Sequence, residues 1–224
     1  MTRDLALVVF DMAGTTVLDD GHVPAAFTAA LAEHGVIVTA DHLSAVRGAS
    51  KREAIARFLT EGPARAARAA AAYETFRARL GDAYRSSGVR PVAGAQRAFE
   101  RLRARGIRVA LNTGFDRELT DLLLDALGWR HDVVDAVICG DDVPAGRPAP
   151  YLIFRAMEAT RTTHVRTVAN VGDTTLDLEA GQNAGVGWNI GVLSGAHTRA
   201  QLERAPHTHL IDSVADLDGP VFGW

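Results

Sequence analysis

The sequence predicts an α/β protein with a doubly wound parallel sheet and a helical insert. Apolar, strand-like runs alternate with amphipathic helical segments over most of the 224 residues, and this pattern is typical of a parallel sheet covered by helices on both faces. Between Pro24 and Arg85 the alternation stops, and Ala, Leu and Arg recur at helical spacing. We therefore expect a core domain over residues 1–18 and 88–224 and a helical domain over residues 19–87.

The first strand covers Leu5 to Phe10 and ends at Asp11. Because nearly all of its residues are apolar, we expect it in the buried middle of the sheet. The rest of the chain is expected to form a Rossmann-like core around it. Helices are predicted over 24–36, 50–60 and 64–84 in the insert and over 93–106, 116–128, 148–160 and 176–185 in the core, and strands over 107–114, 133–140, 166–173, 187–192 and 208–211.

Charge and hydropathy restrict the classes of partner. The formal net charge is −3 and the arginines are scattered along the chain, so neither nucleic acid nor an anionic membrane surface is indicated. No apolar run reaches the ~18 residues that span a bilayer, and the apolar start is too short for a signal peptide. With Cys139 as the only cysteine there is no intrachain disulfide, and we expect a cytoplasmic protein.

Polar side chains recur where the predicted strands end. Asp11, Thr113 and Asp173 each follow a strand, and Arg147 precedes a helix. Because ligands of parallel α/β sheets bind beyond the carboxyl ends of the strands, we expect these four residues to converge. The sequence therefore predicts a site for a small anionic ligand at this edge of the sheet.

The turn after Asp11 adds two further observations. Gly14, Thr15 and Thr16 supply a tight turn with backbone N–H groups and hydroxyls, which suit a phosphoryl group held against Asp11. If Asp11 is a nucleophile, an acid two residues later would be the natural proton donor to a leaving oxygen. That position is Ala13, so the reaction must proceed without this acid.

The motifs "DMAGTT", "NTG", "GRP" and "GDTTLD" together resemble the haloacid dehalogenase superfamily of phosphotransfer enzymes. The resemblance implies an aspartyl-phosphate on Asp11, and the helical insert resembles the mobile cap that closes over the site in one branch of that superfamily. Magnesium suits hard oxygen ligands. By resemblance, the magnesium ligands would be Asp11, the Ala13 carbonyl and Asp173. The substrate would be bound by Gly14, Thr15, Asn112, Thr113, Gly114 and Arg147. Thr174 and Asp177 would lie behind these residues and support them.

Ala13 and the segment "DDVPAGRP" resemble the phosphonatase branch, which hydrolyses phosphonoacetaldehyde. The leaving group of that reaction is carbon, and a carbanion leaves phosphorus only when it is delocalised, as it is when a β-carbonyl has become an imine. Lys51 is the single lysine among 24 basic residues and lies in "RGASKREAI", where the Schiff-base lysine of this branch falls. Arginine cannot replace it, because a guanidinium stays protonated.

The chain also departs from the phosphonatase pattern. The residue three after Lys51 is Ala54 where a histidine is expected, Arg47 stands where methionine is expected, and Phe115 where tyrosine is expected. Proton transfer at an imine is therefore left to water or His22. Arg47 is predicted to contact the substrate and to enlarge or recharge its pocket.

Three interpretations of the function stay open from the sequence. The first is a magnesium-dependent C–P hydrolase that forms an imine on Lys51. The second is a phosphate-monoester hydrolase in which Lys51 only binds the substrate anion. The third is a phosphometabolite sensor without catalysis, because fold does not fix function. A haloalkanoate dehalogenase is disfavoured because Asp173 is retained. The expected partner is a small anionic phosphonate or phosphate, and a homodimer is one open oligomeric state.

Overall fold

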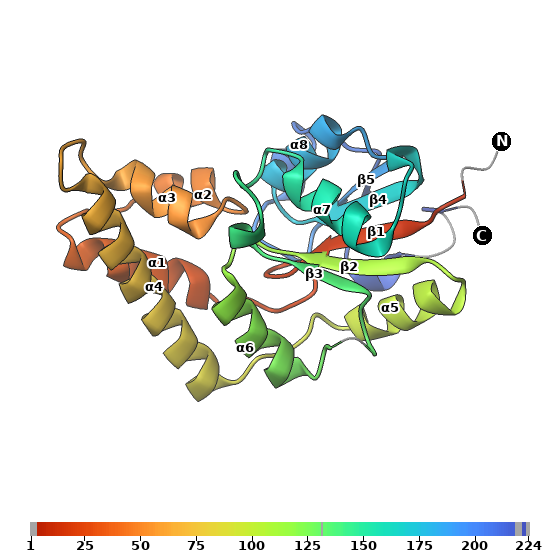
Figure 1. The fold of residues 1–224 in the computed structure, drawn as a ribbon, viewed down its shortest axis with the longest axis horizontal. Helices are drawn as coiled ribbons and strands as arrows, with labels where there is room; N and C mark the ends of the chain where they lie inside the picture. Colours follow the sequence, from red (N-terminus) through yellow and green to blue (C-terminus); the bar gives the residue numbers. More distant parts are fainter. Residues whose placement is uncertain (1–3, 131, 218–220, 223–224) are drawn as a thin grey trace.

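The computed structural model describes residues 4–130, 132–217 and 221–222 (Figure 1). Its central sheet has six parallel strands in the order β3-β2-β1-β4-β5-β6. This order reverses direction at β1 and confirms the predicted doubly wound, Rossmann-like sheet. The strands are β1 Leu7–Asp11, β2 Arg108–Asn112, β3 Ala136–Ile138, β4 Val168–Gly172, β5 Trp188–Val192 and β6 His209–Ile211.

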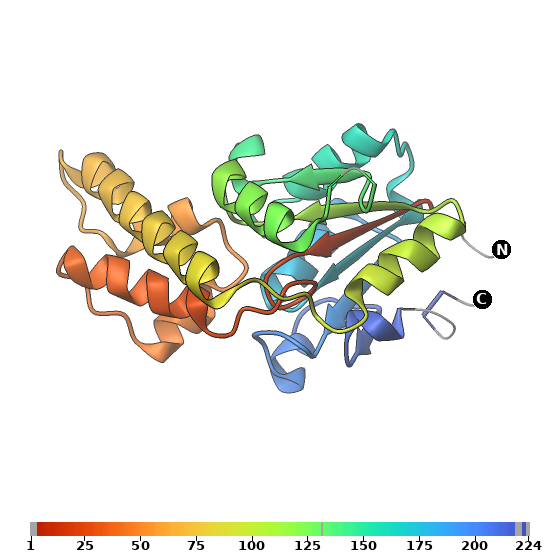
Figure 2. The ribbon, with the colours of Figure 1, turned by 90° about the horizontal axis from the view of Figure 1, so that it is seen from below.

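Helices cover both faces of this sheet (Figures 1 and 2). Successive residues of β1 point to opposite faces, so Val8 and Phe10 pack in one apolar cluster with residues of α5 and α6. Leu7 and Val9 pack in a second cluster with residues of α7 and α8. The core helices are α5 Ala95–Ala104, α6 Arg117–Leu127, α7 Tyr151–Thr160, α8 Thr175–Ala184 and α9 Arg199–Leu202, and short 3₁₀ turns are η1 Gly140–Asp142, η2 Val165–Thr167 and η3 Val214–Asp216.

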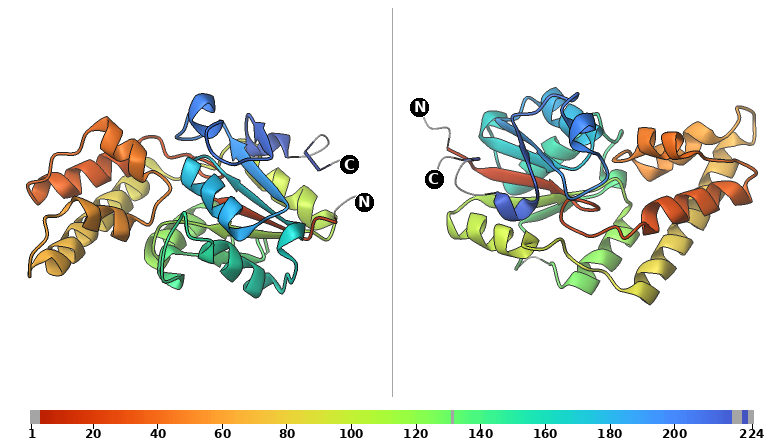
Figure 3. Two further views of the ribbon diagram at one scale, coloured as in Figure 1. Left: turned by 90° about the horizontal axis from the view of Figure 1, so that it is seen from above. Right: turned by 180° about the vertical axis from the view of Figure 1, so that it is seen from behind.

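The insert forms a group of helices beside the carboxyl edge of the sheet (Figure 3). Its members are α1 His22–Glu33, α2 Ala40–Val46, α3 Lys51–Phe58 and α4 Arg65–Ser87. The rings of Phe27 and Phe76 join α1 to α4 edge to face, with centroids 6.1 Å apart. The proposed division into domains 1–18 with 88–224 and 19–87 stays a prediction.

Two helices were not expected from the sequence. The helix α2 has only seven residues, and its capping box uses Thr39 with His42, whose Nδ1 accepts the Thr39 N–H at 3.4 Å. A box normally ends in Glu or Gln, and seven residues carry little periodicity. The four-residue α9 is shorter still. Among the residues that the structure describes, no helix is long and apolar enough to cross a bilayer.

Candidate active site

A tight turn follows Asp11 at the end of β1. The N–H groups of Thr15 and Thr16 both donate to the Met12 carbonyl, at 3.2 and 2.8 Å. Gly14 has a φ of +94°, and a Cβ there would lie 2.3 Å from Asp173 Oδ2. Only glycine permits this conformation and this approach. The turn therefore brings the end of β1 against the carboxylate that follows β4.

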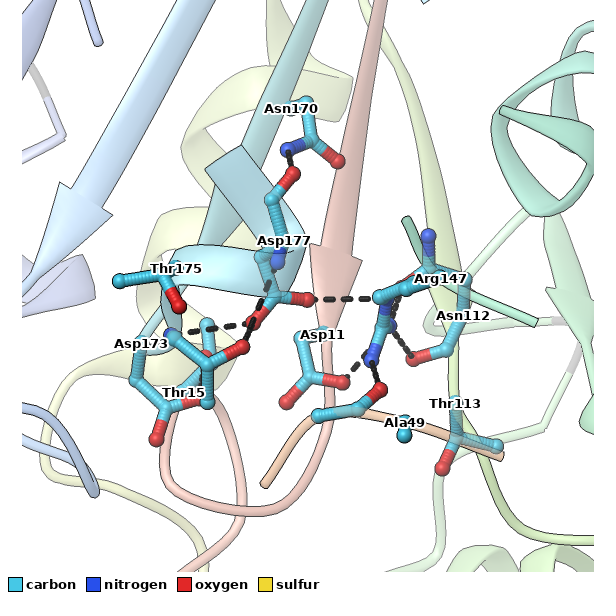
Figure 4. Close-up of polar contacts among 12 residues, drawn as sticks. Asp11, Thr15, Ala49, Asn112, Thr113, Arg147, Asn170, Asp173, Thr175 and Asp177 are labelled. Carbon is cyan, nitrogen blue, oxygen red and sulfur yellow. Dashed lines mark hydrogen bonds and ion pairs between the residues drawn. The ribbon is translucent and has the colours of Figure 1, made fainter. Parts of the chain in front are cut away.

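Arg147 lies at the centre of the charged groups (Figure 4). Its Nη2 is 2.7 Å from Asp11 Oδ1, and its Nε is 2.9 Å from Asp177 Oδ1. Nη2 also donates to Asn112 Oδ1, and Nη1 donates to the Gly48 carbonyl at 3.2 Å. The guanidinium therefore has its orientation fixed by the ends of β1 and β2, by the first turn of α8 and by the insert.

Asp177 has two tasks, one for each carboxylate oxygen. Oδ2 accepts the Thr174 N–H at 3.0 Å and so caps the start of α8, where an anion is favoured by the helix dipole. Oδ1 pairs with Arg147. Asp177 thus lies behind Arg147, and Thr174 lies on the cavity wall. The roles predicted for both residues stay predictions.

Asp173 is enclosed just beyond β4. Its Oδ1 accepts the Thr15 hydroxyl at 3.1 Å and its Oδ2 accepts the Ala196 N–H at 2.7 Å. Burial, together with the charges of Asp11 and Asp177, raises the pKa of Asp173 to about 8. Burial also raises the pKa of Asp11 to about 6, although Arg147 opposes this. The protein alone does not fully neutralise its buried carboxylates.

This excess of negative charge suits a divalent cation. One cavity is lined by Asp11, Ala13 and Asp173. Carboxylate and carbonyl oxygens are the ligands that Mg²⁺ prefers. Within the described residues, no cluster of three or more His, Cys, Asp or Glu side chains is arranged to hold a metal. Asp11, Asp173 and Ala13 fit a magnesium ion held by two carboxylates, with a carbonyl and water as the remaining ligands.

Lys51 is the first residue of α3 and is buried. Its Nζ donates to the Ala49 carbonyl at 3.0 Å and lies 5.8 Å from the centroid of the Phe115 ring. In the part of the chain that the structure describes, no carboxylate forms an ion pair with it. Burial lowers the pKa of Lys51 to about 8, and Arg147 contributes to this, although Asp11 opposes it. A large share of the amine is thus neutral near pH 8.

One cavity joins Lys51 to the strand ends. The volume of this cavity is about 60 Å³, which favours a small substrate. Its wall combines a charged end on the core with an apolar end on the insert. The lining residues are Asp11, Ala13, Asp19, Val23, Pro24, Phe27, Leu43, Val46, Arg47, Gly48, Lys51, Thr113, Gly114, Phe115, Arg147, Asp173, Thr174 and Ala196.

Most of the predicted site residues meet in this cavity, and a few lie behind it. Gly14 and Thr15 are not on its wall, because their N–H groups are used within the turn and the Thr15 hydroxyl bonds to Asp173. Asn112 reaches the site only through Arg147. A direct contact of Gly14, Thr15 or Asn112 with a substrate stays a prediction.

The cavity also corrects one expectation and adds one residue. His22, considered as a proton carrier, is not on the wall; its ring packs against Tyr84, with centroids 5.8 Å apart. Asp19 is on the wall, and its charge acts on Lys51. Asp19 lies in the link from β1 to α1, where no strand end or motif marked it. The only sequence signal was a carboxylate close after the "DMAGTT" turn.

Comparison with known proteins identifies the family. The family model of the haloacid dehalogenase-like hydrolases matches residues 5–185. The chain therefore belongs to this family of hydrolases. It is similar to its phosphonatase-like branch: phosphonoacetaldehyde hydrolase of Bacillus cereus is 31% identical over 203 residues, which cover 84% of this chain and 76% of that protein.

Other relatives agree, with shorter or weaker matches. Phosphonoacetaldehyde hydrolase of Bacteroides fragilis is 38% identical over 120 residues, and the match spans 44% of that protein's length. A phosphonoacetaldehyde hydrolase-like protein of Oleispira antarctica has a similar structure, with a TM-score of 0.82 and 24% identity over 97% of this chain and 91% of that one. CbbY of Rhodobacter sphaeroides, solved with phosphate, has a TM-score of 0.79 and 22% identity, covering 97% of this chain and 98% of that one. These two structures support the fold.

Proposed function

We propose that this chain is a magnesium-dependent hydrolase that cleaves the C–P bond of a small β-carbonyl phosphonate such as phosphonoacetaldehyde. Lys51 carries the proposal, because it is a buried amine with a lowered pKa on the wall of the cavity that also holds Asp11. A neutral amine is a nucleophile toward a carbonyl carbon. An amine that served only to bind an anion would gain nothing from losing its charge. The names of the curated relatives support the same substrate class.

The reaction begins at the carbonyl group. The Lys51 amine adds to the carbonyl carbon, and loss of one water leaves an imine. The Asp11 carboxylate then attacks phosphorus, and the electron pair of the breaking C–P bond is delocalised into the imine, which becomes an enamine. This leaving group needs no proton on oxygen, in agreement with Ala13 at the position of the usual acid.

The remaining steps regenerate the enzyme. The enamine takes a proton on carbon, and water hydrolyses the resulting imine to free Lys51. A second water hydrolyses the aspartyl-phosphate on Asp11, so that one water is consumed overall and phosphate is released. Asp19 is the carboxylate on the same wall whose charge acts on Lys51, and we assign it the proton transfers at the imine.

The phosphoryl group is bound by the charged end of the cavity. Arg147 and the Thr113–Gly114 step line this end and would bind the phosphoryl oxygens as their charge develops. When bound by Asp11, Asp173 and the Ala13 carbonyl, Mg²⁺ offsets the repulsion between the Asp11 carboxylate and the phosphoryl oxygens. The apolar end of the wall on the insert excludes water from the imine.

A phosphate-release assay tests the proposal. Purified protein with Mg²⁺ is given phosphonoacetaldehyde and, in parallel, a panel of phosphate monoesters of similar size. The proposal predicts phosphate from the phosphonate with a kcat/KM at least about tenfold above that for any monoester. Turnover of monoesters alone would establish the phosphate-ester function, and turnover of nothing in the presence of tight binding would favour a sensor.

A further inference from the structure

Arg47 is a cation on the cavity wall that no anion of the described chain neutralises. It directly follows α2 and is half-buried. Among the described residues, no carboxylate pairs with its guanidinium and no hydrogen bond of its side chain is formed. A partly desolvated charge without a counterion costs free energy. Such a charge is expected where a ligand supplies the anion.

Several other arginines near the site or on the insert pair with carboxylates of the protein. Arg147 contacts two carboxylates. On the insert, Arg65 pairs with Glu61 at 2.5 Å, and Arg79 pairs with Glu33. Arg47 differs from them because it lies on the cavity wall and, among the described residues, pairs with no carboxylate.

The backbone that carries Arg47 is held against the core. His197 Nδ1 accepts the Thr175 N–H at 3.1 Å, so its Nε2 is free to donate to the Ser44 carbonyl at 3.4 Å. Gln201 Nε2 donates to the Ser44 hydroxyl at 3.3 Å. Two core side chains thus fix the end of α2, and with it the start of the Arg47 side chain, relative to the strand ends.

Asp19 is the carboxylate on the insert side of the wall, and its charge acts on neighbours other than Arg47. The charge of Asp19 acts on Lys51 and Tyr84. Burial lowers the pKa of His197, and the charge of Arg47 lowers it further. Asp19 Oδ1 also accepts the Val23 N–H at 2.8 Å. Asp19 therefore does not serve as the counterion of Arg47.

We propose that the substrate carries a carboxylate beyond its carbonyl carbon and that Arg47 binds it, which makes the substrate a 3-phosphono-2-oxocarboxylate. This inference rests on the proposed function. The phosphonate would lie at Asp11 and Arg147, the ketone carbon at Lys51, and the carboxylate at Arg47, all residues of one wall. A guanidinium presents two parallel N–H donors to a carboxylate, and the small cavity favours this group over a second phosphate.

The reaction balances for this substrate. The Lys51 amine forms an imine at the ketone carbon, and one water leaves. Asp11 attacks phosphorus, and the C–P electron pair enters the imine to give an enamine, which takes a proton on its terminal carbon. Hydrolysis of the imine and of the aspartyl-phosphate then gives a 2-oxocarboxylate with a methyl group, and phosphate. One water is consumed overall.

The test compares two phosphonates that differ only in the carboxylate. The ratio of kcat/KM for 3-phosphonopyruvate to that for phosphonoacetaldehyde is measured with Mg²⁺ for the parent, Arg47→Met, Arg47→Lys and, as a control on the exposed face of α3, Arg57→Met. We expect a ratio above about ten in the parent, a fall of at least about tenfold in Arg47→Met, mainly through KM, and partial recovery in Arg47→Lys. Arg57→Met should keep the parental ratio.

The possible outcomes separate the role of Arg47 from the proposed function. Efficient turnover of phosphonoacetaldehyde with a ratio that Arg47→Met leaves unchanged overturns the assignment of Arg47 and leaves the proposed function standing. Turnover of phosphate monoesters but of neither phosphonate overturns both. If nothing is turned over, calorimetric binding of the two phosphonates to Asp11→Asn decides: equal affinities with Arg47 present contradict the assignment, and tighter binding of the oxo acid that Arg47→Met abolishes supports it.

Discussion

At the scale of single residues, the proposed reaction requires that the amine of Lys51 be neutral. Its Nζ has a carbonyl and an aromatic ring beside it and is buried. Burial opposes the charged form, and Arg147 adds repulsion. An arginine in the same place would keep its charge at every accessible pH. The identity of this residue, beyond its charge, therefore decides between the two enzymatic functions.

The substitution Lys51→Arg separates these functions. If Lys51 only binds an anion, the specificity constant should fall by about tenfold or less. If the amine forms the imine, C–P cleavage should fall by several orders of magnitude. Steady-state kinetics on the best phosphonate substrate measures this, with the exposed Arg57→Lys on the same helix as a control. A Lys51→Arg enzyme near parental activity would refute the imine.

The pH profile tests the same residue independently. With the pKa of Lys51 lowered to about 8, half of the amine is neutral at about pH 8, and the neutral fraction rises with pH and levels off about one pH unit higher. The rate of imine formation in single-turnover experiments should follow this curve. A rate that continues to rise toward pH 10, near the ordinary lysine pKa of about 10.4, would show that the pKa is not lowered.

The residues of the core side of the site could be predicted from the sequence, and those of the insert only in part. Asp11, Thr113 and Asp173 each end a parallel strand, and such ends share one edge of the sheet. Asp19 lies between β1 and α1, and Glu53 lies on α3. No periodic pattern in the sequence predicts which way these two side chains point. Glu53 Oε1 accepts the Gly146 N–H at 2.8 Å, a contact across 93 residues that only the folded insert creates.

Three glycines allow the elements of insert and core to meet. A Cβ on Gly48 would lie 2.3 Å from Thr174 Oγ1, one on Gly114 would lie 2.5 Å from the Ala49 carbonyl, and one on Gly146 would lie 2.8 Å from Ser50 Cβ. Such distances require something to move. Ala49 and Ser50 thus pack directly against the core backbone at Gly114 and Gly146, and Gly48 packs against the Thr174 side chain. These contacts hold Lys51 over the strand ends.

The substitution Gly48→Ala should therefore open the site. Gly48 has a φ of +81° and Gly35 a φ of +75°, but a Cβ on Gly35 meets nothing within 4 Å. Alanine at either position carries a similar backbone strain of about 1–2 kcal/mol. We expect both variants to lose similar thermal stability and only Gly48→Ala to lose about tenfold or more in kcat/KM. Equal activities of the two variants would contradict the close packing of insert and core.

The order of the core elements was predictable because β2, β3 and β4 are each followed by a core helix, as in "IRVALNTG" before "DRELTDLLLDALG". The helix α2 was not predictable, since its seven residues are held by contacts to His197 and Gln201 from the far end of the chain. Tertiary contacts of this kind leave no local pattern in the sequence.

At the scale of the whole molecule, the sheet places three carboxylates, Asp11, Asp173 and Asp177, at one edge, and the insert covers them (Figures 1 and 4). Arg147 contacts two of them. Burial, together with repulsion from the neighbouring carboxylates, raises the pKa of both Asp11 and Asp173. A bound divalent cation should therefore stabilise the fold as well as support turnover.

Thermal unfolding tests this consequence without an activity assay. A concentration of Mg²⁺ about five times its Kd should stabilise the parent by about 1 kcal/mol, which raises the Tm of a domain of this size by about 2–4 °C. Asp173→Asn in EDTA near neutral pH should be about as stable as the parent, because a carboxyl with a pKa of about 8 is already mostly uncharged there. It should gain nothing from Mg²⁺. Equal Mg²⁺ shifts in both proteins would place the cation elsewhere.

The central claim is a covalent bond between Lys51 and a carbonyl phosphonate, and reductive trapping tests it most directly. Borohydride added during turnover of phosphonoacetaldehyde should inactivate the parent and leave an ethyl or phosphonoethyl group on the peptide that contains Lys51, detected by mass spectrometry. In Asp11→Asn, where the C–P bond stays intact, we predict the phosphonoethyl group alone. A parent enzyme that turns over the phosphonate but carries no adduct on Lys51 after borohydride would contradict the account.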